Sequence, residues 1–210
     1  MNRWLSCSRA GAWAVWLLLG VLPREVLADA AGLTGDRVGE VRYGVYLPRQ
    51  SAAGAPLPLL VVLHGCRQSA AEMRALTGFD GLAEKHGFVV AYAEIGASPT
   101  NPLGCWTWWL PANLSRGHGV PADLVGVVAR VAQSTPLDTT RVYVAGFSSG
   151  AAMALVAAAL YPDVFAAAGV HSGLPFGAAG AWTCATRVME EGDETAAARA
   201  LDVLGARGAR

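Results

Sequence analysis

The 210-residue sequence has few of the features that mark a protein binding polyanions. Lysine occurs once, as Lys85, and 16 basic and 16 acidic side chains give a formal net charge of zero. A neutral chain exerts no long-range attraction on nucleic acid or on an anionic membrane surface, so we expect neither as a partner. The composition, with 15% charged and 53% hydrophobic residues, is typical of a globular or secreted protein and not of a disordered one.

The sequence also lacks a hydrophobic run that would span a bilayer comfortably. Arg3 and Arg9 precede an uncharged segment over 10–23, and its apolar centre at 13–19 is short for a transmembrane helix. Small residues suited to cleavage follow around 26–30. The pattern predicts a secretory signal peptide over residues 1–30, and hence a secreted extracellular or periplasmic protein with no membrane association after cleavage. The alternative is an uncleaved membrane anchor.

Cysteine is scarce as well, with four residues in the chain. Cys7 falls within the predicted signal peptide and leaves Cys66, Cys105 and Cys184. Secretion permits disulfides. An odd number means that at least one cysteine is unpaired within this chain.

The most informative segment that is present is 141–161, which reads RVYVAGFSSGAAMALVAAALY. A short β-rich apolar run is followed by Gly-Phe-Ser-Ser-Gly and then by a run of helix-forming small residues. Strand, G-x-S-x-G and helix in this order predict a nucleophile elbow that exposes the hydroxyl of Ser148. Side chains at Gly146 and Gly150 would collide across the tight turn. The alternative is an ordinary serine in a strand-to-helix turn.

The rest of the chain alternates between strand and helix patterns. Strands are expected over 41–47, 59–63, 88–92, 142–145 and 165–170, and helices over 69–86, with glycine interruptions, and 121–133. This alternation predicts a single α/β domain with a mostly parallel sheet and helices on both faces. A Trp-rich connection over 95–119 has no clear period.

A second group of residues with chemical potential lies at the end of the strand expected over 59–63. Acyl transfer needs donors for an oxyanion, and such donors are backbone N–H groups after the nucleophile and in an earlier loop. Here these are the N–H groups of Ser149 and Cys66. For His64 we expect a structural role, bonding its own loop, over a role as catalytic base.

The segment Cys105-Trp106-Thr107-Trp108-Trp109 has two equally supported interpretations. The indoles could form a stacking platform for a sugar or an aromatic substrate. They could equally form a hydrophobic lid packed on the edge of the sheet.

The motifs HGCRQ, FVVAY, CWTWW, RGHG, RVYVAGFSSGAAMA and YPDVFAAAGVHSGLPFGAA together resemble the secreted esterases of the polyhydroxybutyrate depolymerase family, within the α/β-hydrolase fold. Feruloyl and acetylxylan esterases are relatives of that family. The resemblance implies a serine esterase that cleaves carboxylic esters through an acyl-enzyme, with no cofactor and no metal. Ser148 matches the nucleophile, and Cys66 and Ser149 match the oxyanion hole. His171 matches a family segment beside the site, where we expect substrate contact, and does not match the catalytic histidine.

The sequence departs from the family pattern after the elbow. In α/β-hydrolases an acid and then a histidine follow the serine. Here His171 comes too early, and Asp193 and Asp202 lie in an expected helix. We therefore expect residues 31–210 to be a C-terminally truncated α/β-hydrolase domain without its last strands, acid and base. The alternative is a base recruited from elsewhere, such as His118.

The resemblance also carries two expectations about the loops. We expect a disulfide between Cys66 and Cys105, with Cys184 left as the odd thiol, against the alternative of three free cysteines. We expect Trp106, Trp108 and Trp109 near the cleft, where they would favour an uncharged, bulky ester of the polyester or polysaccharide type. A non-catalytic polymer-binding protein remains an alternative. A peptidase or thioesterase of the same fold is disfavoured by the HGC and CW pair. The sequence makes no prediction of oligomeric state.

Overall fold

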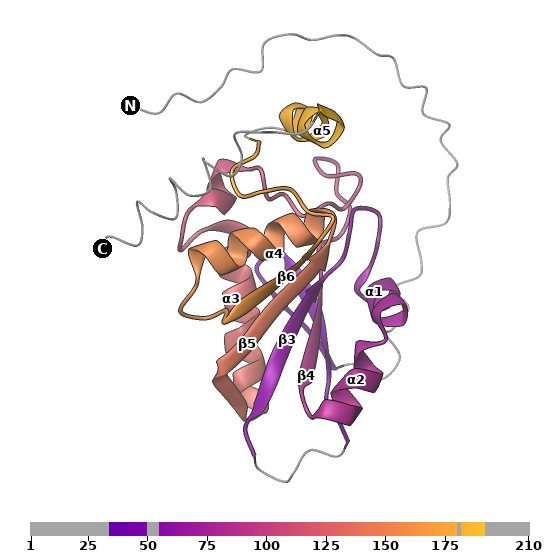
Figure 1. The fold of residues 1–210 in the computed structure, drawn as a ribbon, viewed down its shortest axis with the longest axis vertical. Coiled ribbons are helices and arrows are strands. Elements are labelled where there is room, and N and C mark those ends of the chain that lie inside the picture. The colour runs from indigo at the N-terminus through magenta and orange to yellow at the C-terminus, as the bar shows by residue number, and fades with distance from the viewer. Residues whose placement is uncertain (1–33, 50–54, 180–181, 192–210) are drawn as a thin grey trace.

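The described part of the chain is an open α/β sheet with helices on both faces (Figure 1). The computed structural model describes residues 34–49, 55–179 and 182–191. The predicted signal peptide, Asp193 and Asp202 lie outside these residues, as does the side chain of Cys184. Within the described residues, no helix combines the length and the hydrophobicity needed to cross a bilayer.

The sheet has six strands in the order β1-β2-β4-β3-β5-β6. Neighbours among β3 to β6 pair in parallel, whereas β1 and β2 pair antiparallel to each other and β2 pairs antiparallel to β4. The mostly parallel sheet predicted from the alternating pattern is therefore confirmed. The strands are β1 (Thr34–Val38), β2 (Val41–Tyr46), β3 (Leu57–Leu63), β4 (Val89–Glu94), β5 (Leu137–Phe147) and β6 (Ala167–His171).

Two strand predictions need correction. β1 was not predicted; it exists because it pairs along β2 over five residues of each strand. β6 begins at Ala167 and not at Phe165. The N–H of Phe165 donates to the carbonyl of Tyr161 (2.9 Å), and the Phe165 ring is buried in the core, so this residue closes the turn after α4 instead of starting the strand.

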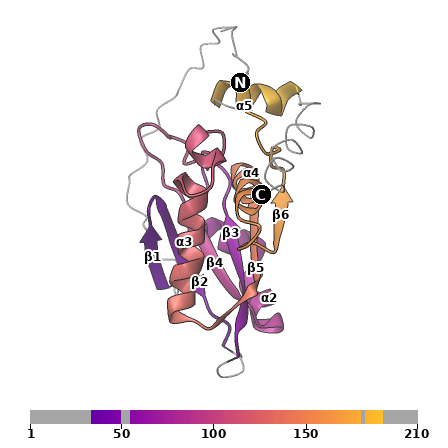
Figure 2. The same ribbon diagram turned by 90° about the vertical axis from the view of Figure 1, so that its left-hand side faces the viewer.

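The helices form layers on the two faces of the sheet (Figure 2). Alternation along β3 divides the core: Val61 and Leu63 belong to the larger cluster under α3 and α4, and Val62 belongs to the smaller cluster under α1 and α2. The helical elements are α1 (Ala70–Thr77), α2 (Phe79–His86), the 3-10 helix η1 (Pro111–Leu114), α3 (Gly119–Ser134), α4 (Ser149–Leu160) and α5 (Trp182–Glu191).

Local sequence signals set the ends of the first two helices. Ser69 and Glu72 form a reciprocal capping box at the start of α1. Gly78 adopts a left-handed conformation (φ 61°) that ends α1 and precedes α2, so the interrupted helix predicted over 69–86 is two helices. The loop between β3 and α1 therefore lies at the upper edge of the sheet in Figure 1.

Candidate active site

Ser148 occupies a sharp turn between β5 and α4. Its φ of 54° and ψ of −118° are unfavourable for a residue with a side chain, as expected for a nucleophile elbow. Two hydrogen bonds hold this conformation: the Ser148 N–H donates to the carbonyl of His171 (2.9 Å), and the Ser148 carbonyl accepts from the N–H of Ala152 (3.1 Å). The turn is thus fixed by the neighbouring strand on one side and by the first turn of the helix on the other.

The two motif glycines are required by close backbone contacts. A Cβ atom on Gly146 would lie 2.3 Å from the carbonyl carbon of Gly150. A Cβ atom on Gly150 would lie 2.4 Å from the carbonyl oxygen of His64, which belongs to the loop after β3. The predicted collision is confirmed, and it extends further than predicted, because Gly150 also lets the β3 loop approach the elbow.

The loop 64–68 is held by a hydrogen bond within the loop and by two links to the Trp-rich connection over 95–119. The Gly65 N–H donates to Oε1 of Gln68 (2.8 Å), and the Arg67 N–H donates to the carbonyl of Leu103 (2.7 Å). A disulfide joins Cys66 to Cys105, as predicted. These constraints fix the backbone on both sides of Cys66.

His64 is fully buried beside this loop, and both ring nitrogens are engaged. Nε2 accepts from the N–H of Ile95 (3.1 Å), so the proton resides on Nδ1 and is donated to the carbonyl of Gly65 (2.7 Å). Burial lowers the pKa of His64, and the hydrogen bond to Gly65 opposes this only in part. The predicted structural role, bonding its own loop, is confirmed.

Cys66 and Ser149 both line the pocket in which Ser148 lies. Ser149 is the first residue of α4, so its N–H has no acceptor within the helix and sits at the positive end of the helix dipole. The Cys66 N–H belongs to the peptide whose carbonyl His64 holds, and a trans peptide points these two groups in opposite directions. The oxyanion hole stays a prediction.

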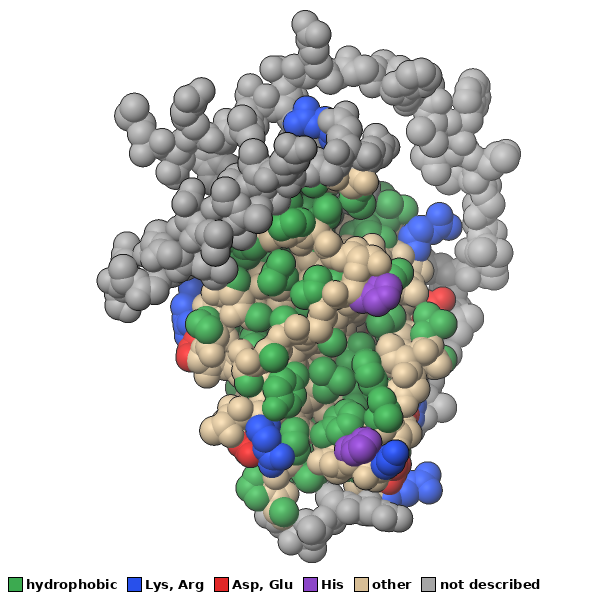
Figure 3. All heavy atoms as spheres, viewed as in Figure 1, with side chains coloured by type: hydrophobic (Ala, Val, Ile, Leu, Met, Phe, Trp, Pro, Cys, Tyr) green, Lys and Arg blue, Asp and Glu red, His purple; other side chains and the backbone are tan. Residues whose placement is uncertain are grey.

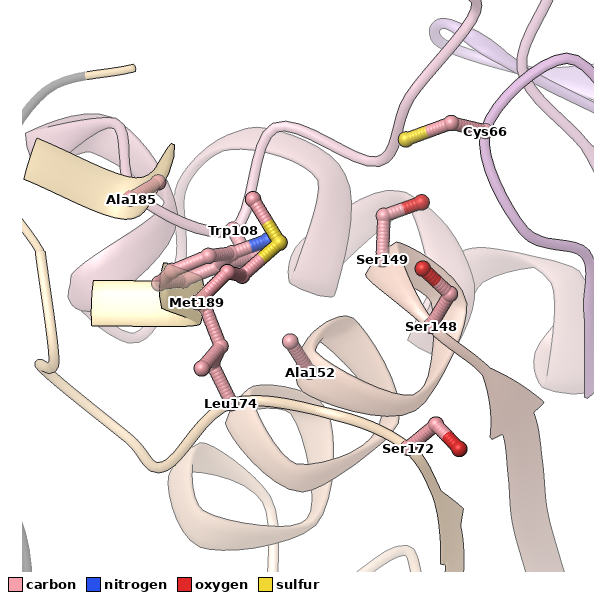
Figure 4. Close-up of a pocket in the computed structure, with 9 residues that line it drawn as sticks. All are labelled: Cys66, Trp108, Ser148, Ser149, Ala152, Ser172, Leu174, Ala185 and Met189. Carbon is pink, nitrogen blue, oxygen red and sulfur yellow. The ribbon is translucent and has the colours of Figure 1, made fainter. Parts of the chain in front are cut away.

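The pocket has a polar end and an apolar end (Figure 4). Ser148, Ser149, Ser172 and Cys66 lie toward one end, whereas hydrocarbon groups, the Met189 thioether and the Trp108 indole form the other. Among the described residues that line the pocket, none is charged. The lining residues are Cys66, Trp108, Ser148, Ser149, Ala152, Ser172, Leu174, Ala185 and Met189.

The three tryptophans of the predicted cluster occupy different positions. Trp106 is completely buried, 5.3 Å from the His64 ring between ring centroids, and its Nε1 has no hydrogen-bond partner among the described residues. Trp109 is also buried and meets Trp108 edge-on, with ring centroids 5.6 Å apart. All three side chains are buried in the larger core cluster, and of the three only Trp108 also lines the pocket.

Asn113 is a buried polar residue that the sequence analysis missed. Its Nδ2 donates to the carbonyl (2.7 Å) and to Oγ1 (2.9 Å) of Thr107, and its Oδ1 accepts from the N–H of Val120 (2.8 Å). The amide therefore ties the tryptophan segment to the first turn of α3 and positions Trp108. An Asn four residues after a tryptophan run carries no sequence signal for this role.

The remaining histidines do not contact the Ser148 hydroxyl in the part of the chain that the structure describes. His171 is exposed at the end of β6, with Nδ1 3.0 Å from Oγ of Ser172, and its ring faces Phe147. His118 is exposed at the N-terminus of α3. The described residues likewise contain no cluster of three or more histidine, cysteine or acidic side chains suited to a metal ion.

Comparison with known proteins now decides the family. The sequence profile described as "Esterase PHB depolymerase" matches residues 41–206. The chain belongs to this esterase family. It is 38% identical over 165 residues to poly(3-hydroxyalkanoate) depolymerase C of Paucimonas lemoignei, covering 78% of this chain and 39% of that protein. It is 32% identical over 167 residues to feruloyl esterase B of Talaromyces funiculosus, covering 77% and 44%.

Solved structures agree with this family and fold. An acetyl xylan esterase from Aspergillus awamori superposes with a TM-score of 0.65 at 30% identity, over 73% of this chain and 56% of that one. An S-formylglutathione hydrolase from Agrobacterium tumefaciens, at 20% identity and a TM-score of 0.60, supports the α/β-hydrolase fold alone. The chain spans about half the length, or less, of the curated family members it matches first.

Proposed function

We propose that this chain carries the nucleophile and the oxyanion hole of a serine esterase that hydrolyses uncharged carboxylic esters. The observation that carries the proposal is the conformation of Ser148, a strained serine at the head of α4 in a pocket shared with Cys66 and Ser149. A serine is held at positive φ only where the surrounding structure over-determines it, and such positions cluster at functional sites.

The proposed chemistry forms an acyl-enzyme on Ser148. Its Oγ attacks the ester carbonyl carbon, and the charge that develops on the carbonyl oxygen is stabilised by the N–H groups of Cys66 and Ser149. The ester C–O bond then breaks and the alcohol leaves with a proton. Water later attacks the acyl group, and the acid is released with Ser148 restored.

The reaction also needs a base for the Ser148 proton. In the described residues, the ring nitrogens of His64 are both occupied, and His171 and His118 are not bonded to the serine. General-base help contributes about 10²–10⁴-fold to such reactions. We therefore expect Ser148 of the 210-residue chain to react more slowly, by about this factor, than the serine of a family member with a general base at its nucleophile.

The pocket favours an uncharged substrate, because none of its described lining residues is charged. On the face of the molecule drawn in Figure 3, hydrophobic and other uncharged side chains, with histidine among them, occupy the middle, and charged groups lie nearer the margins. Relatives are named for polyhydroxyalkanoate, feruloyl and acetylxylan esters, all of which are neutral at the scissile bond. By this analogy we propose a polyester or polysaccharide-linked ester as the substrate.

Covalent labelling with a fluorophosphonate tests the proposal. Ser148 should be phosphonylated, as located by peptide mass spectrometry, and Ser148→Ala should abolish labelling. Ser172→Ala is the matched control, because it removes another hydroxyl from the same pocket. Hydrolysis of p-nitrophenyl butyrate should follow the same pattern. Labelling of the Ser148→Ala variant at the wild-type rate would refute the role of Ser148.

A second candidate function is non-catalytic polymer binding, favoured by the absence of a base at Ser148 in the described residues. It predicts co-sedimentation with polyester particles that Ser148→Ala leaves unchanged, without any phosphonylation of the wild-type chain. The labelling experiment therefore separates the two functions.

We further propose that the protein is secreted. The disulfide between Cys66 and Cys105 supports this, since such bonds persist in oxidising compartments. Expression with and without residues 1–30, followed by assay of the medium and the periplasm, tests whether that segment directs export.

A further inference from the structure

The apolar end of the pocket is built from four parts of the chain that meet beside Ser148. Ala152 lies one turn further along α4 and forms the floor, and Leu174 comes from the segment after β6. Trp108, held in place through Thr107 and Asn113, forms a wall. Figure 4 shows these side chains on the side of the pocket away from the serine hydroxyls.

The helix α5 closes this end. Ala185 and Met189 are four residues apart, so they lie on the same face of the helix, and both line the pocket. Ala185 is buried, whereas Met189 remains 55% exposed, which places it at the rim. In Figure 1, α5 lies above the start of α4. The unbranched Met189 side chain can adapt its conformation to a bound group. Its length would set how far a bound chain can extend past the rim.

The chemistry of this end discriminates between the ester classes of the relatives. A methylene chain placed against Trp108, Leu174 and Met189 gains roughly fourfold in affinity per buried CH₂. A phenolic hydroxyl placed there would meet hydrocarbon, sulfur and one donor, the indole N–H of Trp108, and the described lining side chains at this end offer no strong acceptor for its proton. A buried hydroxyl left unpaired loses between about fivefold and a hundredfold in binding.

We propose that α5 closes an acyl pocket selective for short aliphatic acyl groups over phenolic ones, with Met189 as the residue that limits acyl length. The inference rests on the proposed esterase function and deepens it: the acyl group of the ester is of the acetyl to hydroxybutyryl kind and not of the feruloyl kind. The polar end can accept a hydroxyl near the carbonyl, because Ser172 lines it.

The test uses alkyl fluorophosphonates, whose P-alkyl group takes the place of the acyl chain. The Ser148 oxygen bonds to phosphorus, fluoride leaves, and the hydroxyl proton passes to solvent. Rates of Ser148 phosphonylation are measured by intact mass for propyl and hexyl probes on the full 210-residue chain. Any deficit in general-base help slows both probes alike, so the ratio of the two rates reports the pocket.

Met189→Ala should raise the hexyl-to-propyl rate ratio by roughly fivefold to tenfold, and Met189→Phe should lower it. Leu82→Ala is the matched control, because it removes a similarly exposed apolar side chain on α2, at the opposite end of the molecule, and should leave the ratio unchanged. Thermal unfolding of each variant verifies the fold. A second pair of probes, 3-phenylpropyl and 3-(4-hydroxyphenyl)propyl, should differ by at least about fivefold in favour of the phenyl probe.

The outcomes separate this inference from the function on which it rests. If Ser148 is labelled but neither Met189 variant changes the ratio, or if the phenol probe reacts as fast as its phenyl counterpart, the acyl-pocket inference is wrong and the esterase proposal stands. If no probe labels Ser148 in the wild-type chain, both fail.

Discussion

The peptide between Gly65 and Cys66 is anchored by the buried His64, whose Nδ1–H donates to its carbonyl. The proposed oxyanion hole would use the N–H of the same peptide, which points away from that carbonyl. The Ser148 N–H donates to the carbonyl of His171, the last residue of β6, and the Ser148 side chain points into the pocket. At the scale of residues, the site is therefore an arrangement of backbone groups fixed by neutral hydrogen bonds.

The protonation of His64 should make stability depend on pH. Its pKa is lowered in the folded protein by burial, so between the folded value and the unfolded value of about 6.5 the unfolded chain binds an extra proton. The contribution of His64 to the free energy of unfolding is therefore fully present above pH 6.5. It falls as the pH decreases, by up to about 1.4 kcal/mol per pH unit. Urea unfolding between pH 7 and pH 5 should show this slope.

The matched variants identify the residue responsible. His64→Gln should flatten the slope, and His86→Gln, which changes an exposed histidine at the end of α2, should retain it. A slope that survives in His64→Gln would assign the pH dependence to other groups. The same variant should lower the rate of Ser148 phosphonylation, because the Gly65–Cys66 peptide loses its anchor.

At the scale of elements, the strand-helix junction depends on the absence of side chains at particular places. Gly150→Ala would place a methyl group 2.4 Å from the His64 carbonyl oxygen, so the β3 loop must move away from the elbow. We expect a loss of about 2–4 kcal/mol in stability, comparable to severe overpacking, and a loss of labelling. Denaturant unfolding and the phosphonylation assay measure both effects.

Gly81 provides the contrasting case within a helix. A Cβ atom there would meet nothing within 4 Å, and the residue lies inside α2. Gly81→Ala should therefore stabilise the protein by about 0.5–1 kcal/mol, because alanine has the higher helix propensity. A neutral Gly150→Ala would contradict the close packing described at the junction, and a destabilising Gly81→Ala would contradict the open space described beside α2.

The disulfide should contribute substantially to the stability of the two loops that it joins. The linked residues are 39 apart in sequence, and closing a loop of this length contributes on the order of 3–4 kcal/mol in the chain-entropy model. The double variant Cys66→Ala and Cys105→Ala should lose about this much in denaturant unfolding. Reduction of the wild-type protein should give a similar loss, and a loss under 1 kcal/mol would indicate that the hydrogen bonds alone hold the loops.

Sequence patterns predicted the buried elements well and the exposed ones poorly. The runs 59–63 and 142–145, the second of which leads into the elbow, are apolar on both faces, so local composition was sufficient. The segment 34–38 contains Gly35, Asp36 and Arg37 and becomes a strand only because it pairs along β2. The burial of Trp106 and Trp109 was beyond sequence analysis, because it depends on a contact with a loop some forty residues earlier and on an amide, Asn113, with no sequence signature.

At the scale of the whole molecule, β6 is one of the two edge strands of the sheet, with β1 at the other edge, among the residues that the structure describes. It pairs with β5 on one side, and in the described part of the chain no strand pairs with its other side. Val170 in this strand is 44% exposed. Edge strands with exposed apolar side chains are sites of self-association, and a lysine on the strand counteracts it. Val170→Lys should therefore raise the concentration at which the 210-residue chain stays monomeric, measured by light scattering.

The control for this prediction is Leu76→Lys, which replaces a more exposed apolar side chain on α1, away from the sheet edge. It should leave self-association unchanged, since α1 is a helix and has no strand edge with which another chain could pair. Equal effects of the two variants would show that net charge, and not the strand edge, governs association.

The disulfide between Cys66 and Cys105 also bears on the order in which the structure forms. The sheet and the elbow can form by hydrogen bonding and burial on the timescale of ordinary folding, whereas the disulfide requires an oxidant and forms over seconds to hours. Cys66 lines the pocket, so the pocket reaches its final form only after oxidation. On the proposed esterase function, a chain kept among reducing thiols would therefore hold an incomplete site, and ester hydrolysis would be delayed until the bond forms.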